Sequence, residues 1–212
     1  MDRQSAGLVA GAVAVVALVA AATGYYLWTT RAGTDPLAAC RKGEVAGPAI
    51  GGPFTLVDSE GRTVTDADVL TGPTLVYFGY TFCPDVCPMD MARNAEAADI
   101  LEREGKALKL VFISVDPARD TPQVAGEFAH AIHPDAIGLS GSPEQVAAAA
   151  RAYRVYYKVN DDDPEYYTVD HSTYSYLMLP GIGFANFYGH TDTAGAVAEN
   201  ASCMIDAAAR QN

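Results

Sequence analysis

The sequence predicts an α/β fold with a mixed central sheet, preceded by one membrane-spanning helix. Two apolar strand patterns, Thr74 to Gly79 and Lys109 to Val115, are each followed by a helix pattern, which is the order of a parallel strand–helix–strand unit. Two later strand patterns, joined by a short turn, add an antiparallel pair. At the other end of the chain, residues 4–30 contain no charged side chain.

Residues 1–30 form the expected membrane anchor. The stretch from Leu8 to Trp28 consists almost wholly of Val, Ala, Leu and Gly, and about 20 such residues cross the hydrocarbon core as a helix. A cleaved signal peptide is the alternative, with the alanines at 20–22 as its cleavage site. The apolar run continues past that point and ends in aromatic residues that suit the membrane–water boundary, which favours an uncleaved anchor. Basic residues flank both ends, so the positive-inside rule does not favour an exported domain.

The first elements beyond the anchor follow from local patterns. Residues 31–52 are rich in Gly, Ala and Pro and form the expected tether, and residues 53–212 form the domain. A hairpin is expected between residues 54 and 65. The strand Thr74 to Gly79 is short, apolar and bounded by Gly72-Pro73, which is typical of a buried strand. An Ala-rich helix then covers Met89 to Glu104, with Pro88 in its first turn.

The second half of the domain continues the alternation of strands and helices. Thr121-Pro122 has the pattern of an N-cap followed by a first-turn proline, and Ser142 begins a capping box with Gln145. The expected elements are a helix from Thr121 to Ile132, a strand at 137–139, a helix at 142–153, an acidic loop at 160–165, strands at 173–179 and 184–188, and a last helix at 194–210.

Composition excludes one class of partner. The formal net charge is −12, and nearly all of it lies beyond the anchor, so the domain repels phosphate backbones and nucleic-acid binding is not expected. Basic proteins are attracted instead. The four cysteines are too few for a disulfide scaffold in a domain of this size, so a close pair among them indicates chemistry.

Cys83 and Cys87, in the segment CPDVCP, are that close pair. They follow the buried strand Thr74 to Gly79, at the edge of the sheet where α/β proteins place their sites. Residues four apart share one face of a helix, so both sulfurs face one pocket. The positive end of the following helix lowers the pKa of a thiol there. The two thiols can therefore form a redox-active disulfide or bind a soft metal.

A metal site requires at least one more ligand. Of the four histidines, His171 lies directly before a strand and behind Asp170, where its side chain can face the cysteine loop. His130 and His133 lie near an expected helix end, and His190 lies in a turn, so these three are expected at the surface. A lone histidine is most often a core or surface residue, so position alone leaves the third ligand open.

Four segments taken together resemble the SCO/SenC family: YFGYTFCPDVCP, FISVDPARDTP, ARAYRVYYKV and YTVDHSTYSYLMLP. Members of that family are membrane-anchored, thioredoxin-like copper proteins concerned with assembly of cytochrome c oxidase. The resemblance covers about residues 52–209 and departs from the family pattern mainly at the turn Pro180 to Gly183. It implies a thioredoxin-like sandwich with Cys83, Cys87 and His171 as ligands of Cu(I) or Cu(II).

Ligand chemistry agrees with copper. Thiolates select Cu(I), and imidazole suits either copper state, whereas structural zinc takes four ligands and no fourth is evident. Asp170 is a candidate for orienting the imidazole, and an exposed aspartate in a loop is the alternative. The residues Asp116, Arg119 and Asp120 are expected to order a loop near the site, as a purely structural turn. The remaining cysteines, Cys40 and Cys203, are hypothesised to form a disulfide.

Two main functions remain open. The first is a membrane-anchored copper chaperone that delivers copper to the copper A subunit of cytochrome c oxidase. The second is a thiol–disulfide oxidoreductase in which Cys83 and Cys87 cycle, acting on that subunit or on a copper carrier; a redox sensor is a third. Further expected partners are a periplasmic copper carrier and a thioredoxin-like reductant. Since the oxidase site lies outside the cytoplasm, the expected location is the inner membrane with the domain in the periplasm or an equivalent compartment.

Overall fold

The structure is a computed structural model that describes residues 16–26, 37–41, 50–160 and 166–210. The chain divides into two compact units, Met1–Ala39 and Cys40–Asn212. The first unit contains a helix over residues 16–26. Most of the expected anchor lies outside the described residues. Within the described ranges, no helix has both the length and the apolar character needed to cross a membrane.

A seven-stranded mixed sheet forms the centre of the second unit. Its strands lie in the order β2-β1-β5-β4-β3-β8-β9, in which β3, β4 and β5 are parallel and the other pairings are antiparallel. The mixed sheet expected from the sequence is therefore confirmed. The strands are β1 (Thr55–Asp58), β2 (Thr63–Thr65), β3 (Thr74–Gly79), β4 (Lys109–Ser114), β5 (Ile137–Ser140), β8 (Ser175–Leu179) and β9 (Gly183–Tyr188).

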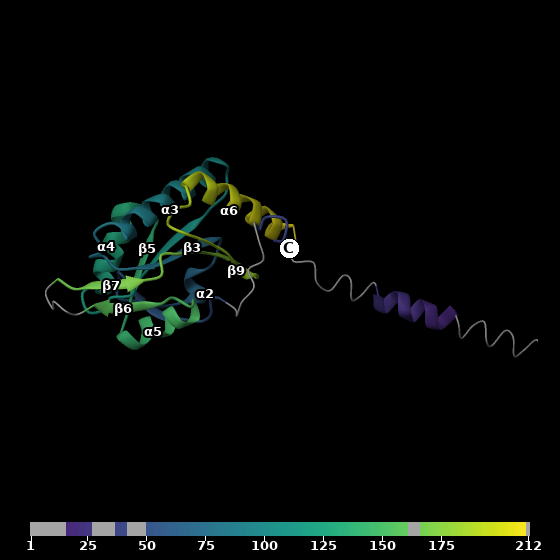
Figure 1. Cartoon of the computed structure of the whole chain (residues 1–212), viewed down its shortest axis with the longest axis horizontal. Helices are drawn as coiled ribbons and strands as arrows, with labels where there is room; N and C mark the ends of the chain where they lie inside the picture. Colours follow the sequence, from purple (N-terminus) through teal and green to yellow (C-terminus); the bar gives the residue numbers. More distant parts are fainter. Residues whose placement is uncertain (1–15, 27–36, 42–49, 161–165, 211–212) are drawn as a thin grey trace, which may run out of the picture. The chain divides into compact units, whose positions relative to one another are not determined.

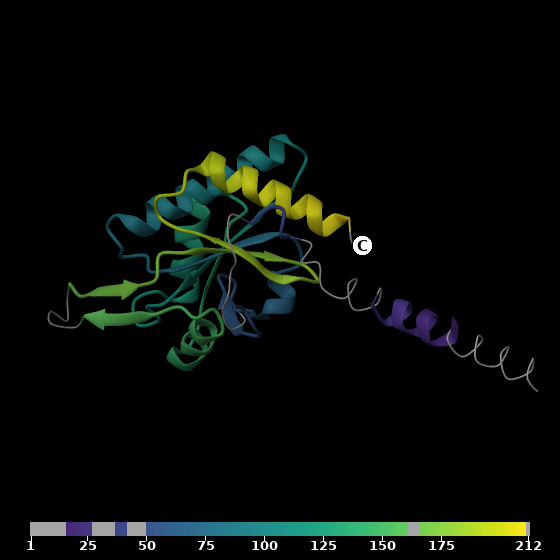
Figure 2. The same ribbon diagram turned by 45° about the vertical axis from the view of Figure 1, so that its right-hand side comes forward.

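Helices cover both faces of this sheet. Figures 1 and 2 show α3 (Val86–Arg103) and α6 (Ala194–Ala209) on one face, and α5 (Pro143–Ala152) on the opposite face. The helix α4 (Pro122–Ile132) contacts α3 and follows the second parallel strand, and a single turn, α2 (Asp66–Val69), follows β2. Thr121 and Ser142 cap α4 and α5 through their side-chain oxygens, as their patterns predict.

One helix begins earlier than the sequence pattern indicates. The expected start was Met89, but α3 begins at Val86, so Cys87 lies in its first turn. Pro88 is then the third helical residue. A proline is tolerated there because the N–H groups of the first turn have no intrahelical acceptor. The earlier start places one of the two sulfurs on regular helical backbone.

A separate two-stranded ribbon, β6 (Tyr157–Asn160) and β7 (Thr168–His171), projects from the domain (Figures 1 and 2). Neither strand was expected from the sequence. The strands are antiparallel, with Tyr157 opposite His171 and Lys158 opposite Asp170. The expected acidic loop at 160–165 lies mostly outside the described residues, and its first residue ends β6. The ribbon matters because its last residue is His171.

An aromatic core packs between the sheet and the end of α5, where Tyr153 is the C-cap residue. The rings of Phe78, Tyr153 and Tyr176 contact one another, with centroids 5.2 to 6.2 Å apart. All three are buried. Aromatic pairs in such T-shaped and tilted arrangements stabilise a core beyond the burial of their area. This core packs β3 against β8, and the segment that carries Cys83 and Cys87 begins at the end of β3.

Cys40 and Cys203 form a disulfide, with their Cα atoms 5.8 Å apart. The hypothesis that these two cysteines pair is therefore confirmed. Cys40 is buried, whereas Cys203 lies on the exposed side of α6. The side-chain amide of Asn200, one turn earlier in α6, also donates a hydrogen bond to the Cys40 carbonyl. The start of the second unit is thus fixed to its final helix.

Candidate metal centre

The two thiols lie where β3 ends and α3 begins. Cys83 is in the loop between these elements and is half-buried, and Cys87 is fully buried in the first turn of the helix. The backbone N–H of Cys87 points to the Cys83 sulfur, with 3.4 Å between the atoms. Both cysteines are free thiols. The strand-to-helix turn therefore brings the two sulfurs to one place, as their spacing predicts.

His171 reaches the thiols from the end of β7. Its Nε2 lies 3.2 Å from the sulfur of Cys87, although 84 residues separate them in sequence. Its Nδ1 lies 3.0 Å from the carbonyl oxygen of Ser172. A proton on Nδ1 donates to that carbonyl and leaves the lone pair of Nε2 directed at the thiols, which is the tautomer a metal ligand needs. The rings of Tyr77 and Tyr80 stand edge-on to the imidazole.

These three side chains form a group that can hold a metal ion. Their ligand atoms all lie within 4.8 Å of one another, and no other such group of His, Cys, Asp and Glu is found in the described part of the chain. The donors are two sulfurs and one imidazole nitrogen, a soft set that suits copper. The set lacks the fourth protein ligand of structural zinc sites. The chemistry of the donors therefore fits copper better than zinc.

Burial controls the protonation of the ligands. It raises the pKa of the Cys87 thiol well above its usual range, and hydrogen bonding and charge at Cys83 raise it further. Burial also lowers the pKa of His171, against smaller opposing effects that include the Ser172 hydrogen bond and the charge of Asp170. Without metal, Cys87 thus holds its proton and His171 is neutral at pH 7. A bound metal ion would take the place of the Cys87 proton, and the neutral imidazole of His171 would be ready to bind it.

The structure places Asp170 at the surface, beside rather than within the cluster. Its side chain is exposed, and it acts on the imidazole through its charge, while the Ser172 carbonyl accepts from Nδ1. Of the other histidines, His133 lies 3.4 Å from Asp99, and His130 is exposed. None of these residues belongs to the metal-binding group.

Two buried polar residues behind the thiols were not anticipated. Asp90 lies one turn after Cys87 and accepts a hydrogen bond from His190 at 2.9 Å, with Arg93 at 3.8 Å. The hydroxyl of Tyr77 and the second carboxylate oxygen of Asp90 are buried without a hydrogen-bond partner among the described residues. Burial, together with the neighbouring Cys87 and Asp90, raises the pKa of Tyr77. The position of Asp90, three residues after Cys87 on a helix, is the signal from which its place could have been predicted.

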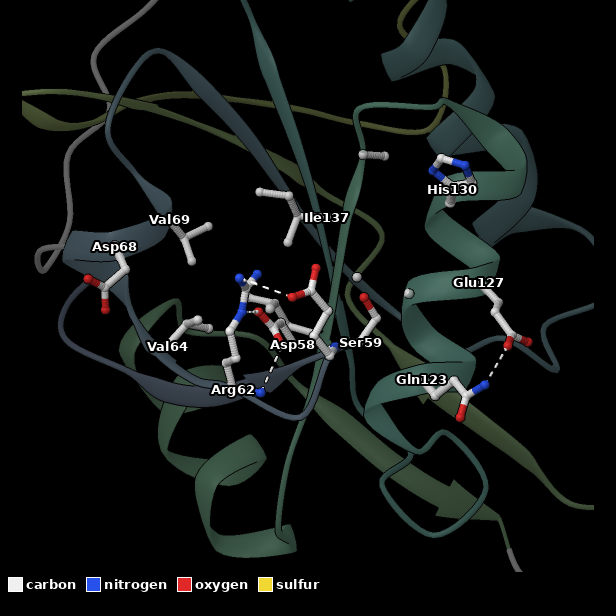
Figure 3. A pocket seen from close by; sticks show the side chains of 15 residues that line it. Asp58, Ser59, Arg62, Val64, Asp68, Val69, Gln123, Glu127, His130 and Ile137 are labelled. Atoms are coloured by element: carbon white, nitrogen blue, oxygen red, sulfur yellow. Dashed lines mark hydrogen bonds and ion pairs between the residues drawn. The ribbon is translucent and has the colours of Figure 1, made fainter.

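A cleft of about 550 Å³ lies elsewhere, between the β1–β2 turn and α4 (Figure 3). Five of its polar side chains are already paired with one another. Asp58 binds Arg62, and Gln123 donates to Glu127 at 2.9 Å. Cys83, Cys87 and His171 do not line it. The cleft is therefore not part of the candidate metal centre.

Comparison with known proteins identifies the family. Residues 42–206 match the family model SCO1/SenC. The chain is 53% identical over 175 residues to Protein SenC of Rhodobacter capsulatus, covering 82% of this chain and 79% of that protein. It is 46% identical over 153 residues to the mitochondrial SCO1 homolog 1 of Arabidopsis thaliana, covering 71% of this chain but 46% of that protein. The chain thus spans about half the length of that mitochondrial relative.

Solved structures agree with the sequence comparison. Arabidopsis thaliana ScoI with copper bound matches with a TM-score of 0.70 and 42% identity, covering 77% of this chain and 100% of that one. Bradyrhizobium japonicum ScoI with copper bound matches with a TM-score of 0.64 and 38% identity, covering 73% and 98%. The expected thioredoxin-like fold is confirmed, and the expected cofactor, copper, is the metal in both relatives. From its motifs, its fold and these matches, the chain belongs to the SCO1/SenC family.

Proposed function

We propose that this protein binds copper through Cys83, Cys87 and His171 and delivers it to the copper A subunit during assembly of cytochrome c oxidase. The observation that carries the proposal is the meeting of two sulfurs and one imidazole nitrogen within 4.8 Å. Two solved relatives with the same fold hold copper. The chain belongs to the SCO1/SenC family, and its motifs resemble those of proteins concerned with assembly of cytochrome c oxidase. This supports the oxidase as the destination of the copper.

The site suits transfer as well as binding. Three protein ligands leave Cu(I) open to a ligand from a partner, so metal can pass by ligand exchange without being released. Cys83 is half-buried and is followed by exposed residues at Pro84 and Asp85, so a partner can approach the metal from that side. The acidic domain favours partners with a basic surface.

We place the domain on the outer side of the cytoplasmic membrane, held by an anchor within residues 1–30. The Cys40–Cys203 disulfide supports this placement, because disulfides persist in oxidising compartments and are rare in the cytoplasm. The uncharged run at residues 4–30 supports the anchor. A reporter fused to the carboxyl terminus tests the orientation: activity of a periplasm-specific reporter is expected, and activity only of a cytoplasm-specific one would refute it.

Substitution of the third ligand tests the copper site. In His171→Ala the two thiols remain but one of the three ligands is lost. If that ligand contributes at least about 1.5 kcal/mol, the Cu(I) affinity should fall at least about tenfold. Competition with a chromophoric Cu(I) chelator measures the affinity. His130→Ala, which removes an exposed histidine, is the matched control and should bind as the parent does. An unchanged affinity in His171→Ala would show that the site does not use three ligands.

Thiol–disulfide exchange is a second candidate function, favoured by the unequal exposure of the two thiols. Cys83 is half-buried and Cys87 is buried, which is the usual arrangement of an attacking and a resolving thiol. The Cys83 thiolate would attack a partner disulfide, and Cys87 would displace the partner thiol, so that two electrons pass to the partner and Cys83–Cys87 becomes a disulfide. Cys87→Ser should then trap the mixed disulfide with a model peptide. If no adduct forms, this function is excluded.

A further inference from the structure

The turn from Asp116 to Asp120 contacts both segments of chain that carry the candidate ligands. From the sequence alone, this turn is expected to be purely structural. We propose instead that it acts as a positioning device, which sets the separation between the thiol pair and the imidazole. The inference rests on the proposed copper site. It assigns the geometry of that site to residues outside the ligand set.

The first contact holds the cysteine loop. Asp120 is 1% exposed, and its carboxylate accepts hydrogen bonds from the Thr81 backbone N–H at 2.8 Å and the Thr81 hydroxyl at 2.5 Å. It accepts a third from Ser114 at 2.6 Å. Thr81 lies two residues before Cys83. Because a buried carboxylate is stabilised only when its lone pairs are paired, the backbone at Thr81 is held in one place.

The second contact holds the ribbon that carries His171. Arg119 Nη1 donates to the Tyr167 carbonyl at 2.9 Å, and the guanidinium carbon lies 3.5 Å from the centre of the Tyr167 ring. The Tyr167 hydroxyl donates to Asp116 at 2.8 Å, and Arg119 Nε donates to the other oxygen of that carboxylate at 2.5 Å. Tyr167 directly precedes β7, so its backbone and its ring are both fixed at the start of the strand that ends in His171.

The two contacts are joined through a short, rigid piece of backbone. The N–H of Asp120 donates to the Asp116 carbonyl at 2.9 Å, and the N–H of Asp116 donates to the Ser114 hydroxyl at 3.0 Å. The Arg119 guanidinium also faces the ring of Phe82, beside Cys83, at 5.0 Å. Within the described residues, the strands of the ribbon pair with each other and with no strand of the main sheet. The turn therefore adds a link between the ribbon and the cysteine loop to the direct contacts of His171 and Val169 with the end of β3 and Tyr80.

Arg119 and His171 can be tested together in a double-mutant cycle. If Arg119 acts on copper only by positioning His171, Arg119→Gln should lower the Cu(I) affinity by about tenfold, and no further when His171 is already Ala. Tyr167→Phe keeps the ring but loses the hydroxyl bond to Asp116, so it should give a smaller loss in the same direction. Losses that simply add across the cycle, or no loss in either variant, would overturn the proposal.

Thr81 tests the other contact with a different readout. Thr81→Val removes the hydroxyl at nearly constant volume, and it should shift the reduction potential of the Cys83–Cys87 pair, because it acts on the thiols. Arg119→Gln should leave that potential unchanged. Thr81→Ser restores the hydroxyl and should restore the parent potential. An equal shift of the potential in the Arg119 and Thr81 variants would indicate general disruption of the fold and would refute separate positioning.

The failure of this inference is distinguishable from that of the copper site. Affinity is measured by chelator competition, the potential by equilibration with glutathione, and folding by near-ultraviolet circular dichroism of each variant. If His171→Ala leaves the affinity unchanged, the three-ligand site fails. If His171→Ala weakens binding but Arg119→Gln and Tyr167→Phe, both folded, bind as the parent does, the site stands and the positioning role is wrong. A correct inference gives loss in all three, with no further loss in the Arg119→Gln/His171→Ala double variant.

Discussion

Breaking the Cys40–Cys203 disulfide should strongly destabilise the domain. The bond joins the first residue of the second compact unit to the last helix, so it closes a loop over almost the whole of that unit. Cys203→Ser is the perturbation of choice because Cys203 is exposed, and its replacement leaves no cavity. The free energy of unfolding of the domain should fall, while its native contacts remain.

The magnitude follows from the length of the closed loop. The two cysteines are 163 residues apart. In the chain-entropy model a loop of this length removes roughly 17 cal/mol/K from the unfolded chain, or about 5 kcal/mol at 25 °C. This is an upper value, since residual structure in the unfolded state lowers it. At about 2 to 4 °C per kcal/mol for a domain of this size, the melting temperature should fall by about 10 to 20 °C.

Urea unfolding followed by circular dichroism measures the effect. The second compact unit, Cys40–Asn212, should carry Cys83→Ser and Cys87→Ser, so that a reductant acts on one disulfide only. In that background, adding dithiothreitol should lower the urea midpoint, and Cys203→Ser should lower it equally. Dithiothreitol should have no effect on the Cys203→Ser variant, which provides the control.

One result would refute this reasoning. Mass spectrometry reports whether the bond is intact in each sample. If the bond is broken and the free energy of unfolding is unchanged to within about 1 kcal/mol, loop closure does not stabilise this domain. If Cys203→Ser lowers the midpoint but dithiothreitol does not, although the bond is reduced, the loss arises from the serine and not from the loop.

The remaining predictions concern the site and one helix end. In Gly79→Ala the new Cβ would lie 2.9 Å from the Cys87 sulfur, so chelator competition should show Cu(I) binding weakened at least about tenfold. Gly195→Ala is the control, because its new Cβ would have no atom within 4 Å, and it should bind Cu(I) as the parent does. Equal binding by the two variants would contradict this prediction. Thr193→Ala removes the N-cap of α6 and should lower the free energy of unfolding, measured in urea, by about 1 kcal/mol. Thr193→Ser keeps the capping hydroxyl and should be about as stable as the parent. An unchanged free energy of unfolding in Thr193→Ala would show that the cap is dispensable. The lowered pKa of His171 means that the unfolded chain binds its proton first, so the stability of the metal-free domain should fall as the pH drops below about 6.5 towards the folded-state value. His171→Gln should flatten that part of the urea-midpoint profile, and a parent profile that is flat there would contradict the reasoning.

Local patterns predicted most elements of the main sheet and the helices around it. The strand β3 agrees with its pattern to the residue, because a short apolar run bounded by Gly-Pro has few alternatives. The caps of α4 and α5 were equally clear, since the capping side chain and the first-turn proline are adjacent in sequence. In these cases the information that specifies the element lies within a few residues.

The ribbon β6–β7 was missed for a physical reason. The burial of Tyr157–Asn160 does not alternate, and of the strand Thr168–His171 only Val169 is fully buried. A strand that packs little of either face leaves no period-two pattern in its sequence. The pairing of these strands is set by contacts at their ends, such as the Ser172 N–H with the Tyr156 carbonyl at 2.9 Å. Those contacts depend on the folded domain.

The site was only partly predictable from sequence. Cys83 and Cys87 are local to one turn, so their spacing alone indicated a shared pocket. His171 comes from an element 84 residues away, and its choice over three other histidines depended on resemblance to a family. The contact of Arg119 with Tyr167 spans 48 residues and joins a loop to a strand that sequence did not predict. Long-range contacts of this kind cannot be read from spacing.

The division of the site between a sheet and a separate ribbon has a consequence for variation among related chains. The thiols lie in the loop after β3 and in the first turn of α3, next to the packed core, so most changes there also disturb the core. The ribbon lies outside that core: Val159 on β6, and Tyr156 directly before β6, are both exposed. Substitutions along the ribbon can therefore alter how firmly the imidazole is held while the sulfurs keep their redox behaviour. We expect related chains to differ in metal retention through the ribbon, and exchange of ribbons between two of them to transfer this property.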